Sequence, residues 1–101
     1  MKLKIDTRKE SGKIAFTLKG RLDTTTYLRL QDVVIPAFDE AKDIELDFAQ
    51  ITLLSTDGLR VLLAGQKKSQ ATGVPMTISN VSEEIMEVFR NTGFADILTI
   101  K

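Results

Sequence analysis

The sequence from Ile44 to Ala64, IELDFAQITLLSTDGLRVLLA, decides the fold because it joins a predicted strand to a predicted helix. Residues 44–48 alternate apolar and acidic side chains, which is typical of a strand with one buried face, and a short loop is expected near Ala49-Gln50. The helix is predicted from about Gly58 to Ala71. Residues 55–58, Ser-Thr-Asp-Gly, lie at the junction, where free backbone N–H groups attract negative charge. A phosphate attached there would be held, and would change what binds the nearby surface.

The segments before this junction predict a hairpin followed by a helix. Residues 3–6 and 14–18 alternate apolar and polar side chains, and Ser11-Gly12 between them is a turn signal. The chain is expected to leave the second strand at residues 20–23, and Thr24, Thr25 and Thr26 are candidate N-caps. Apolar residues then recur at helical spacing from Tyr27 to Ala41. Pro36 interrupts this spacing, so that the helix either kinks there or a second short helical turn begins there.

The segments after the junction add two strands and a helix. Residues 74–78 and 97–100 are predicted strands. Ser82 is the expected cap of the helix between them, with Arg90 in its last turn and Gly93 just beyond its end. The order ββαβαβαβ predicts an α/β fold, in which residues 1–101 form a single domain with a mixed, largely parallel sheet of four to five strands and three or four helices.

The composition excludes several classes of partner. The 101 residues include 14 basic and 14 acidic side chains, so the charge is balanced. Lys and Arg form no run longer than two residues, which argues against nucleic-acid binding. The uninterrupted apolar segments are far too short to span a bilayer, and the N-terminus lacks the apolar core of a signal peptide. We therefore expect a cytoplasmic protein that is not inserted in a membrane.

The absence of two residue types argues against an enzyme. The chain has no Cys and no His, so it offers no thiolate nucleophile, no imidazole base and none of the usual zinc ligand sets. Ser55 could serve as a nucleophile only with a Lys as its base, and no phosphate loop or nucleophile motif accompanies it. The sequence therefore predicts no enzymatic activity, no catalytic residue, no metal and no cofactor.

Three segments, taken in order, resemble one family. They are Gly-Arg-Leu-Asp at 20–23, Ser-Thr-Asp-Gly-Leu-Arg-Val-Leu-Leu at 55–63, and Asn-Val-Ser, Val-Phe and Thr-Gly-Phe within 80–94. Together they resemble a STAS domain, the fold of bacterial anti-sigma factor antagonists, over nearly the whole chain. The resemblance implies a partner that is both an anti-sigma factor and a serine kinase, and whose binding frees a sigma factor for transcription. It also implies that a phosphate on the second helix ends binding, and that a serine phosphatase restores it.

The chain departs from the family at the phosphorylated position. The family pattern is Asp, Ser, Ser or Thr, then Gly, and the residue just before the glycine is phosphorylated. Here that residue is Asp57, which a serine kinase cannot esterify, and Thr56 and Ser55 are the alternative phosphosites. A phosphate on Thr56 would lie about 6 Å from Asp57, with a repulsion of about 0.7 kcal/mol per unit charge in water and ~3 kcal/mol at an effective dielectric of about 20. We therefore predict that Asp57 is a fixed substitute for the switch, or that it simply caps the helix.

The resemblance also implies a surface for the partner, which joins the loop before the first helix to the start of the second. Its predicted residues are Asp23, Ser55, Thr56, Asp57, Gly58 and Arg60. Structural roles compete with this interpretation: residues 55–58 suit an N-cap, Asp23 suits a turn, and Arg60 suits an i, i+3 pair with Asp57. The alternative function is a STAS subunit of a lipid-transport or stress-signalling complex.

Overall fold

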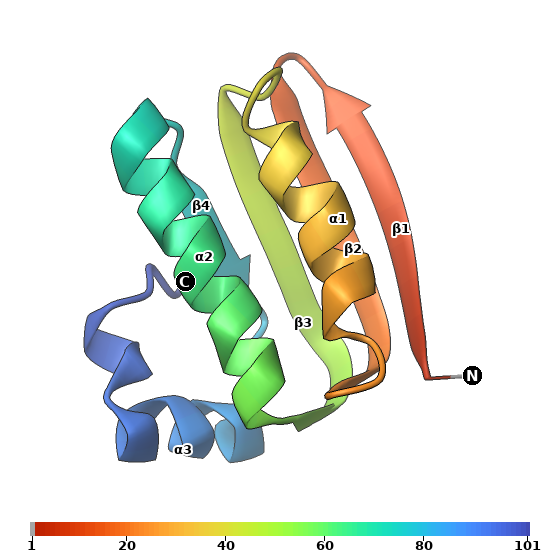
Figure 1. Ribbon diagram of the computed structural model, residues 1–101, viewed down its shortest axis with the longest axis vertical. Coiled ribbons are helices and arrows are strands. Elements are labelled where there is room, and N and C mark those ends of the chain that lie inside the picture. The colour runs from red at the N-terminus through yellow and green to blue at the C-terminus, as the bar shows by residue number, and fades with distance from the viewer. Residues whose placement is uncertain (1) are drawn as a thin grey trace.

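Alternating strand sequences give the protein a one-sided sheet, seen in a computed structural model that describes residues 2–101 (Figure 1). In order, the described residues form β1 (Leu3–Glu10), β2 (Lys13–Leu22), α1 (Tyr27–Ala37), β3 (Asp43–Leu54), α2 (Thr56–Thr72), β4 (Met76–Ser79), α3 (Glu83–Thr92) and a 3₁₀ helix, η1 (Phe94–Asp96). Over these residues the sheet has four strands in the order β1-β2-β3-β4. The predicted α/β class, with a mixed and largely parallel sheet, is confirmed.

The first two strands form a hairpin, and the others join it in parallel. β1 and β2 are antiparallel across Ser11 and Gly12, whose φ angles of 52° and 86° are both positive, as a type I′ turn requires. β2 pairs with β3, and β3 with β4, in parallel. The two parallel links need crossovers, and these are provided by α1 and α2.

Both crossover helices cover the same face of the sheet. Figure 1 shows α1 and α2 side by side over the strands, and both begin at the end of the sheet where the parallel strands finish. The side chains that point toward them are the predicted apolar members of each strand, among them Ile14, Phe16, Leu18, Ile44, Leu46 and Phe48. α3 completes the core with Ile85 and Phe89, whose ring centre lies 6.3 Å from that of Phe48. Charged side chains from the same strands are left on the opposite face.

The predicted loop at Ala49-Gln50 is wrong, because β3 continues through it to Leu54. β3 absorbs its extra residues at two irregularities in its register with β2, between Thr17 and Lys19 and between Gly20 and Arg21. Bulges of this kind let two strands of unequal length stay paired. Because the pairing with β3 continues beyond these irregularities, β2 extends to Leu22. Residues 20–22 therefore belong to the strand rather than to the loop that follows it.

Two further predictions need correction. Residues 97–100 were predicted as a strand, but over the described residues they contribute one isolated bridge, from Ile100 to Ile78, after the η1 turn. The first helix does not extend to Ala41: Pro36 lies in its last turn, and the helix ends at Ala37. The N–H groups of Phe38 and Asp39 then donate to the carbonyls of Ile35 and Pro36, which forms a tighter closing turn. Of the two alternatives for Pro36, this closing turn of i, i+3 hydrogen bonds corresponds to the short helical turn, and it follows the end of α1 directly.

A network of ion pairs and hydrogen bonds on the open face of the sheet centres on Glu45 of β3. Its carboxylate lies 2.7 Å from Lys13 Nζ of β2 and 3.4 Å from Lys101 Nζ, and it accepts a 2.6 Å hydrogen bond from Ser79 Oγ of β4. The bond from Lys13, followed by that from Ser79, lowers the pKa of Glu45 from 4.5 to about 2. One side chain thus links three segments of the sheet. None of the helices formed by residues 2–101 is long and apolar enough to cross a membrane.

This network predicts an acid-dependent contribution to stability. Because the pKa of Glu45 is lower in the folded state, its contribution is complete above about pH 4.5 and is lost as the pH falls toward about 2. Glu45→Gln should therefore lower the free energy of unfolding by about 1–2 kcal/mol at pH 7, and the deficit should shrink between these pH values. Urea titrations at several pH values measure it. The exposed Glu84→Gln is the control, and an equal, pH-independent loss in Glu45→Gln would contradict the assignment.

Candidate partner-binding site

The first turn of α2 is fixed against the end of β2. Ser55 is the N-cap residue, in an extended conformation, and its Oγ accepts a 3.4 Å hydrogen bond from Gly58 N–H. The Ser55 N–H donates to the carbonyl of Leu22 at 3.0 Å. The predicted N-cap role of Ser55 is therefore seen in the structure, and α2 begins at Thr56 rather than at Gly58. The remaining free N–H groups of this turn make an electropositive helix end.

The Asp57 carboxylate joins this helix end to the loop before α1. Its Oδ2 accepts a 2.7 Å hydrogen bond from Thr24 Oγ1, and its Oδ1 lies 3.5 Å from Arg60 Nη1. The side chain is 22% exposed, so it is neither buried in the interior nor free in solvent. Asp57 is therefore a held negative charge, with one partner from each of the two segments. The predicted i, i+3 pair between Asp57 and Arg60 is also seen.

The loop before α1 is organised by Asp23. Its carboxylate accepts hydrogen bonds from the N–H of Thr25 at 2.9 Å and from the Thr25 hydroxyl at 2.6 Å. These bonds, chiefly that from the hydroxyl, lower the pKa of Asp23. Thr26 is buried and donates to the carbonyl of Arg21 at 2.8 Å. The expected turn role of Asp23 is thus seen, and its carboxylate serves its own loop rather than α2.

Gly58 permits the close approach of α2 to β2. A Cβ atom at this position would lie 2.9 Å from both Leu22 Cγ and the Leu22 carbonyl oxygen, and 2.7 Å from Leu54 Cδ1. The carbonyl belongs to the main chain and cannot move aside, so a side chain does not fit here. The glycine of the junction therefore has a packing role.

The six predicted residues come from two segments that the fold brings together, but not all are equally accessible. Thr56 is exposed, and the Arg60 side chain is 72% exposed, whereas Gly58 is buried. Sequence reasoning treated Thr24 only as a helix cap and missed its bond to Asp57, because that bond spans 33 positions. It also passed over Leu28 and Leu53, which are 53% and 44% exposed. Leu28 lies outside the apolar spacing that begins at Tyr27 and Leu30, and this was the signal that could have identified it.

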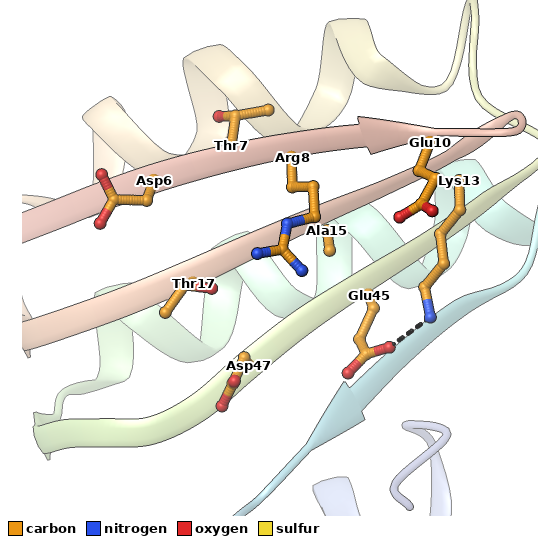
Figure 2. A pocket seen from close by; sticks show the side chains of 9 residues that line it. All are labelled: Asp6, Thr7, Arg8, Glu10, Lys13, Ala15, Thr17, Glu45 and Asp47. Carbon is orange, nitrogen blue, oxygen red and sulfur yellow. Dashed lines mark ion pairs between the residues drawn. The ribbon is translucent and has the colours of Figure 1, made fainter.

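A polar hollow of about 470 Å³ lies on the open face of the sheet, away from α1 and α2 (Figure 2). Its lining includes charged residues of β1, β2 and β3, namely Asp6, Arg8, Glu10, Lys13, Glu45 and Asp47. Figure 2 shows the Lys13–Glu45 ion pair at one side of it. The predicted residues at the start of α2 have no part in this hollow.

Comparisons with known proteins agree with this architecture. The family model described as STAS domain matches residues 4–101. The anti-sigma-B factor antagonist of Bacillus subtilis (strain 168) is 22% identical over 100 residues, which cover 99% of this chain and 92% of the relative. The protein of the same name from Staphylococcus epidermidis is 26% identical over 101 residues, which cover 99% and 94%. An anti-sigma factor antagonist from Mycobacterium paratuberculosis has the same fold, with a TM-score of 0.86, 15% identity, and coverage of 97% of this chain and 84% of that one.

The packing of Gly58 predicts that two glycines of α2 respond differently to alanine. Gly58→Ala should destabilise the protein by about 1–3 kcal/mol, since the new methyl group meets the main chain of Leu22. A Cβ at Gly65 would meet Met76 Sδ at 2.7 Å, but the thioether is flexible. Gly65→Ala also gains up to about 1 kcal/mol of helix propensity, so its net change should stay within about 1 kcal/mol. Thermal and urea unfolding compare the two variants, and equal losses would contradict this role of Gly58.

Proposed function

This chain belongs to the STAS domain family, and we propose that it acts as a regulatory protein-binding module of the anti-sigma factor antagonist kind. In this proposal it is not an enzyme, and it binds an anti-sigma factor that is also a serine kinase, in the cytoplasm. The names of the relatives support the proposal, because these relatives match this chain over nearly their whole length. The observation that carries it is the held carboxylate of Asp57 at the start of α2, beside the exposed Thr56 and Arg60.

The binding surface that we propose surrounds the start of α2. Arg60 presents a positive charge, and Thr24, Thr25 and Thr56 present hydroxyl groups. Leu28 and Leu53 are exposed at the beginning of α1 and the end of β3. A mixture of exposed apolar and polar groups is typical of a non-obligate protein interface.

We further propose that Asp57 is a fixed substitute for the phosphate of the family's switch. A phosphorylated side chain carries nearly two negative charges and three oxygens, whereas Asp57 carries one charge and two oxygens. Thr24 and Arg60 already engage both carboxylate oxygens. A phosphate on Thr56 would therefore lie at a helix end that the Asp57 carboxylate already occupies, and the two negative charges would repel each other. The kinase would find no suitable hydroxyl, and a serine phosphatase would have nothing to remove.

The substitute role predicts how the protein responds to the kinase. After incubation with the anti-sigma kinase and ATP, the wild-type protein should keep its mass, while Asp57→Ser should gain one phosphate because a hydroxyl then precedes Gly58. Intact-mass spectrometry measures both, and Asp57→Asn is the control that lacks both charge and hydroxyl. Stoichiometric phosphothreonine at Thr56 in the wild-type protein would refute the proposal, as would phosphoserine at Ser55.

The same role predicts the direction of a change in affinity. If the carboxylate imitates a phosphate that weakens binding, then Asp57→Asn should bind the anti-sigma factor about three- to tenfold more tightly than the wild type, by analogy with the size of single interface-charge effects. Isothermal titration calorimetry measures this affinity. Asp96→Asn removes the same charge from an exposed position in η1 and should leave the affinity unchanged.

The outcomes of these titrations separate three interpretations. Equal affinity of Asp57→Asn and the wild type would leave Asp57 with a structural role only, as the first-turn carboxylate that binds Thr24 and Arg60. Failure of all variants to bind any anti-sigma factor would overturn the partner itself. Co-purification with subunits of a transporter or of a stress-signalling assembly would then favour the alternative function.

A further inference from the structure

The edge strand β1 presents a free backbone ladder. It is eight residues long and forms one edge of the four-stranded sheet of residues 2–101. The carbonyl of Lys2 accepts a hydrogen bond from the N–H of Arg21, its cross-strand neighbour. Because inward and outward bonding alternate along an antiparallel strand, Lys4, Asp6, Arg8 and Glu10 also bond toward β2. The N–H and C=O groups of residues 5, 7 and 9 therefore point away from the sheet and are able to pair with another strand.

The helix α1 limits this free ladder at its beginning. Arg29 Nη1 donates a 2.7 Å hydrogen bond to the carbonyl of Leu3, which agrees with an outward direction for odd-numbered residues. A strand added to β1 would therefore find its partners between residues 5 and 9. Three facing pairs in this segment would give about six backbone hydrogen bonds.

The charges of β1 alternate in sign on one face of the strand. Lys4, Asp6, Arg8 and Glu10 lie on the open face of the sheet, and Figure 2 shows the last three above the polar hollow. Their signs run plus, minus, plus, minus, and the reversed sequence has the opposite signs. A copy of the same strand in antiparallel orientation is thus electrostatically complementary to it. The single ion pair within this row, from Lys4 to Asp6, is 3.9 Å long and exposed, so it holds neither charge firmly.

We propose that β1 pairs in antiparallel fashion with β1 of a second copy of this chain, with Thr7 facing Thr7 across a twofold axis. In this register Lys4 faces Glu10 of the second copy, and Asp6 faces Arg8. The symmetry repeats both pairs. The outward residues Ile5, Thr7 and Lys9 then form the hydrogen-bonded pairs, and the charged residues form the other pairs, whose side chains lie closer together.

The charges also exclude the neighbouring registers. Any other register must still pair odd-numbered residues with odd-numbered residues, because side chains alternate between the two faces of the strand. The nearest alternatives therefore change the partner of each residue by two positions. In one direction Asp6 faces Asp6 and Lys4 faces Arg8. In the other, Arg8 faces Arg8 and Asp6 faces Glu10. Charged edge strands ordinarily discourage pairing, and here the pattern does so for all close registers except the one centred on Thr7.

The helix side of β1 leaves room for the added strand. A hollow of about 300 Å³ lies there, lined by Thr7 and Lys9 together with Val33, Pro36 and Glu40. Val33 is partly exposed at this border, and the Lys9 ammonium is held 2.5 Å from the Glu40 carboxylate. The dimer would join two sheets into one continuous sheet with all of its helices on one side, because the twofold axis is perpendicular to the sheet. So short an interface gives a weak, reversible dimer.

A charge-exchange series tests the register. Sedimentation velocity at about 0.1–1 mM protein and low salt should show dimer for the wild type. Asp6→Arg places Arg opposite Arg8, and Arg8→Asp places Asp opposite Asp6, so each should weaken the dimer by about tenfold or more. The double variant D6R/R8D restores unlike charges at both pairs and should return the affinity to within about threefold of the wild type. Raised salt should weaken the wild-type dimer.

Two further variants guard against other causes. Asp96→Arg makes the same change in net charge at an exposed position of η1 and should leave the dimer intact. Thr7→Pro removes an outward N–H that the fold does not use, so it should abolish the dimer while circular dichroism and thermal unfolding stay close to the wild type. A wild-type protein that is monomeric throughout the concentration range, or a double variant that stays as weak as the single ones, overturns the proposal. These variants leave residues 55–60 unchanged, so their failure would not affect the proposed function.

Discussion

The contact between the end of β2 and the start of α2 determines where the functional groups of this protein lie. Leu22 contributes a carbonyl to the Ser55 N–H and a surface to which only a glycine at position 58 can fit closely. Because β2 is parallel to β3, both strands finish at the same end, and the loop after one meets the helix after the other. Thr24 and Asp57 are 33 positions apart in the sequence, and the pairing of β2 with β3 together with this contact brings them within hydrogen-bond distance.

The negative charge at the start of α2 is already in place in the absence of a partner. A helix N-terminus favours one anion, and Asp57 supplies it with a charge that has two fixed neighbours, Thr24 and Arg60. In a reversible switch this place is empty in one state and filled in the other. In this chain the covalent structure itself fills it, which is why the proposed regulation cannot depend on a phosphate before Gly58. In the proposed function, modulation of the affinity therefore acts through the concentration of the partner or through other parts of the surface.

The sequence predicted those features that depend on local patterns. The alternation in residues 14–18 and 44–48 correctly placed the buried face of the sheet, and the chemistry of Ser55, Ser82 and Gly93 correctly marked helix ends. Ala49-Gln50 could not be predicted as strand, because their place in β3 depends on bulges opposite β2. Residues 97–100 have strand-forming side chains, but after the η1 turn the chain pairs with β4 only in a single bridge at Ile78. The hydrogen bond from Thr24 to Asp57 depends on tertiary structure alone, so no spacing in the sequence could have predicted it.

The tight turn at Ser11 and Gly12 has a consequence for how the chain reaches its native state. The hairpin of β1 and β2 needs the closure of a very short loop, so it can form within about 1–10 μs without help from the rest of the protein. The parallel neighbour β3 must wait until α1 has bridged the distance, because pairings between remote segments carry a larger entropic cost and are slower. During synthesis the hairpin of β1 and β2 can therefore form before β3 is available, and the strand that is made first, β1, lies at the edge of the finished sheet.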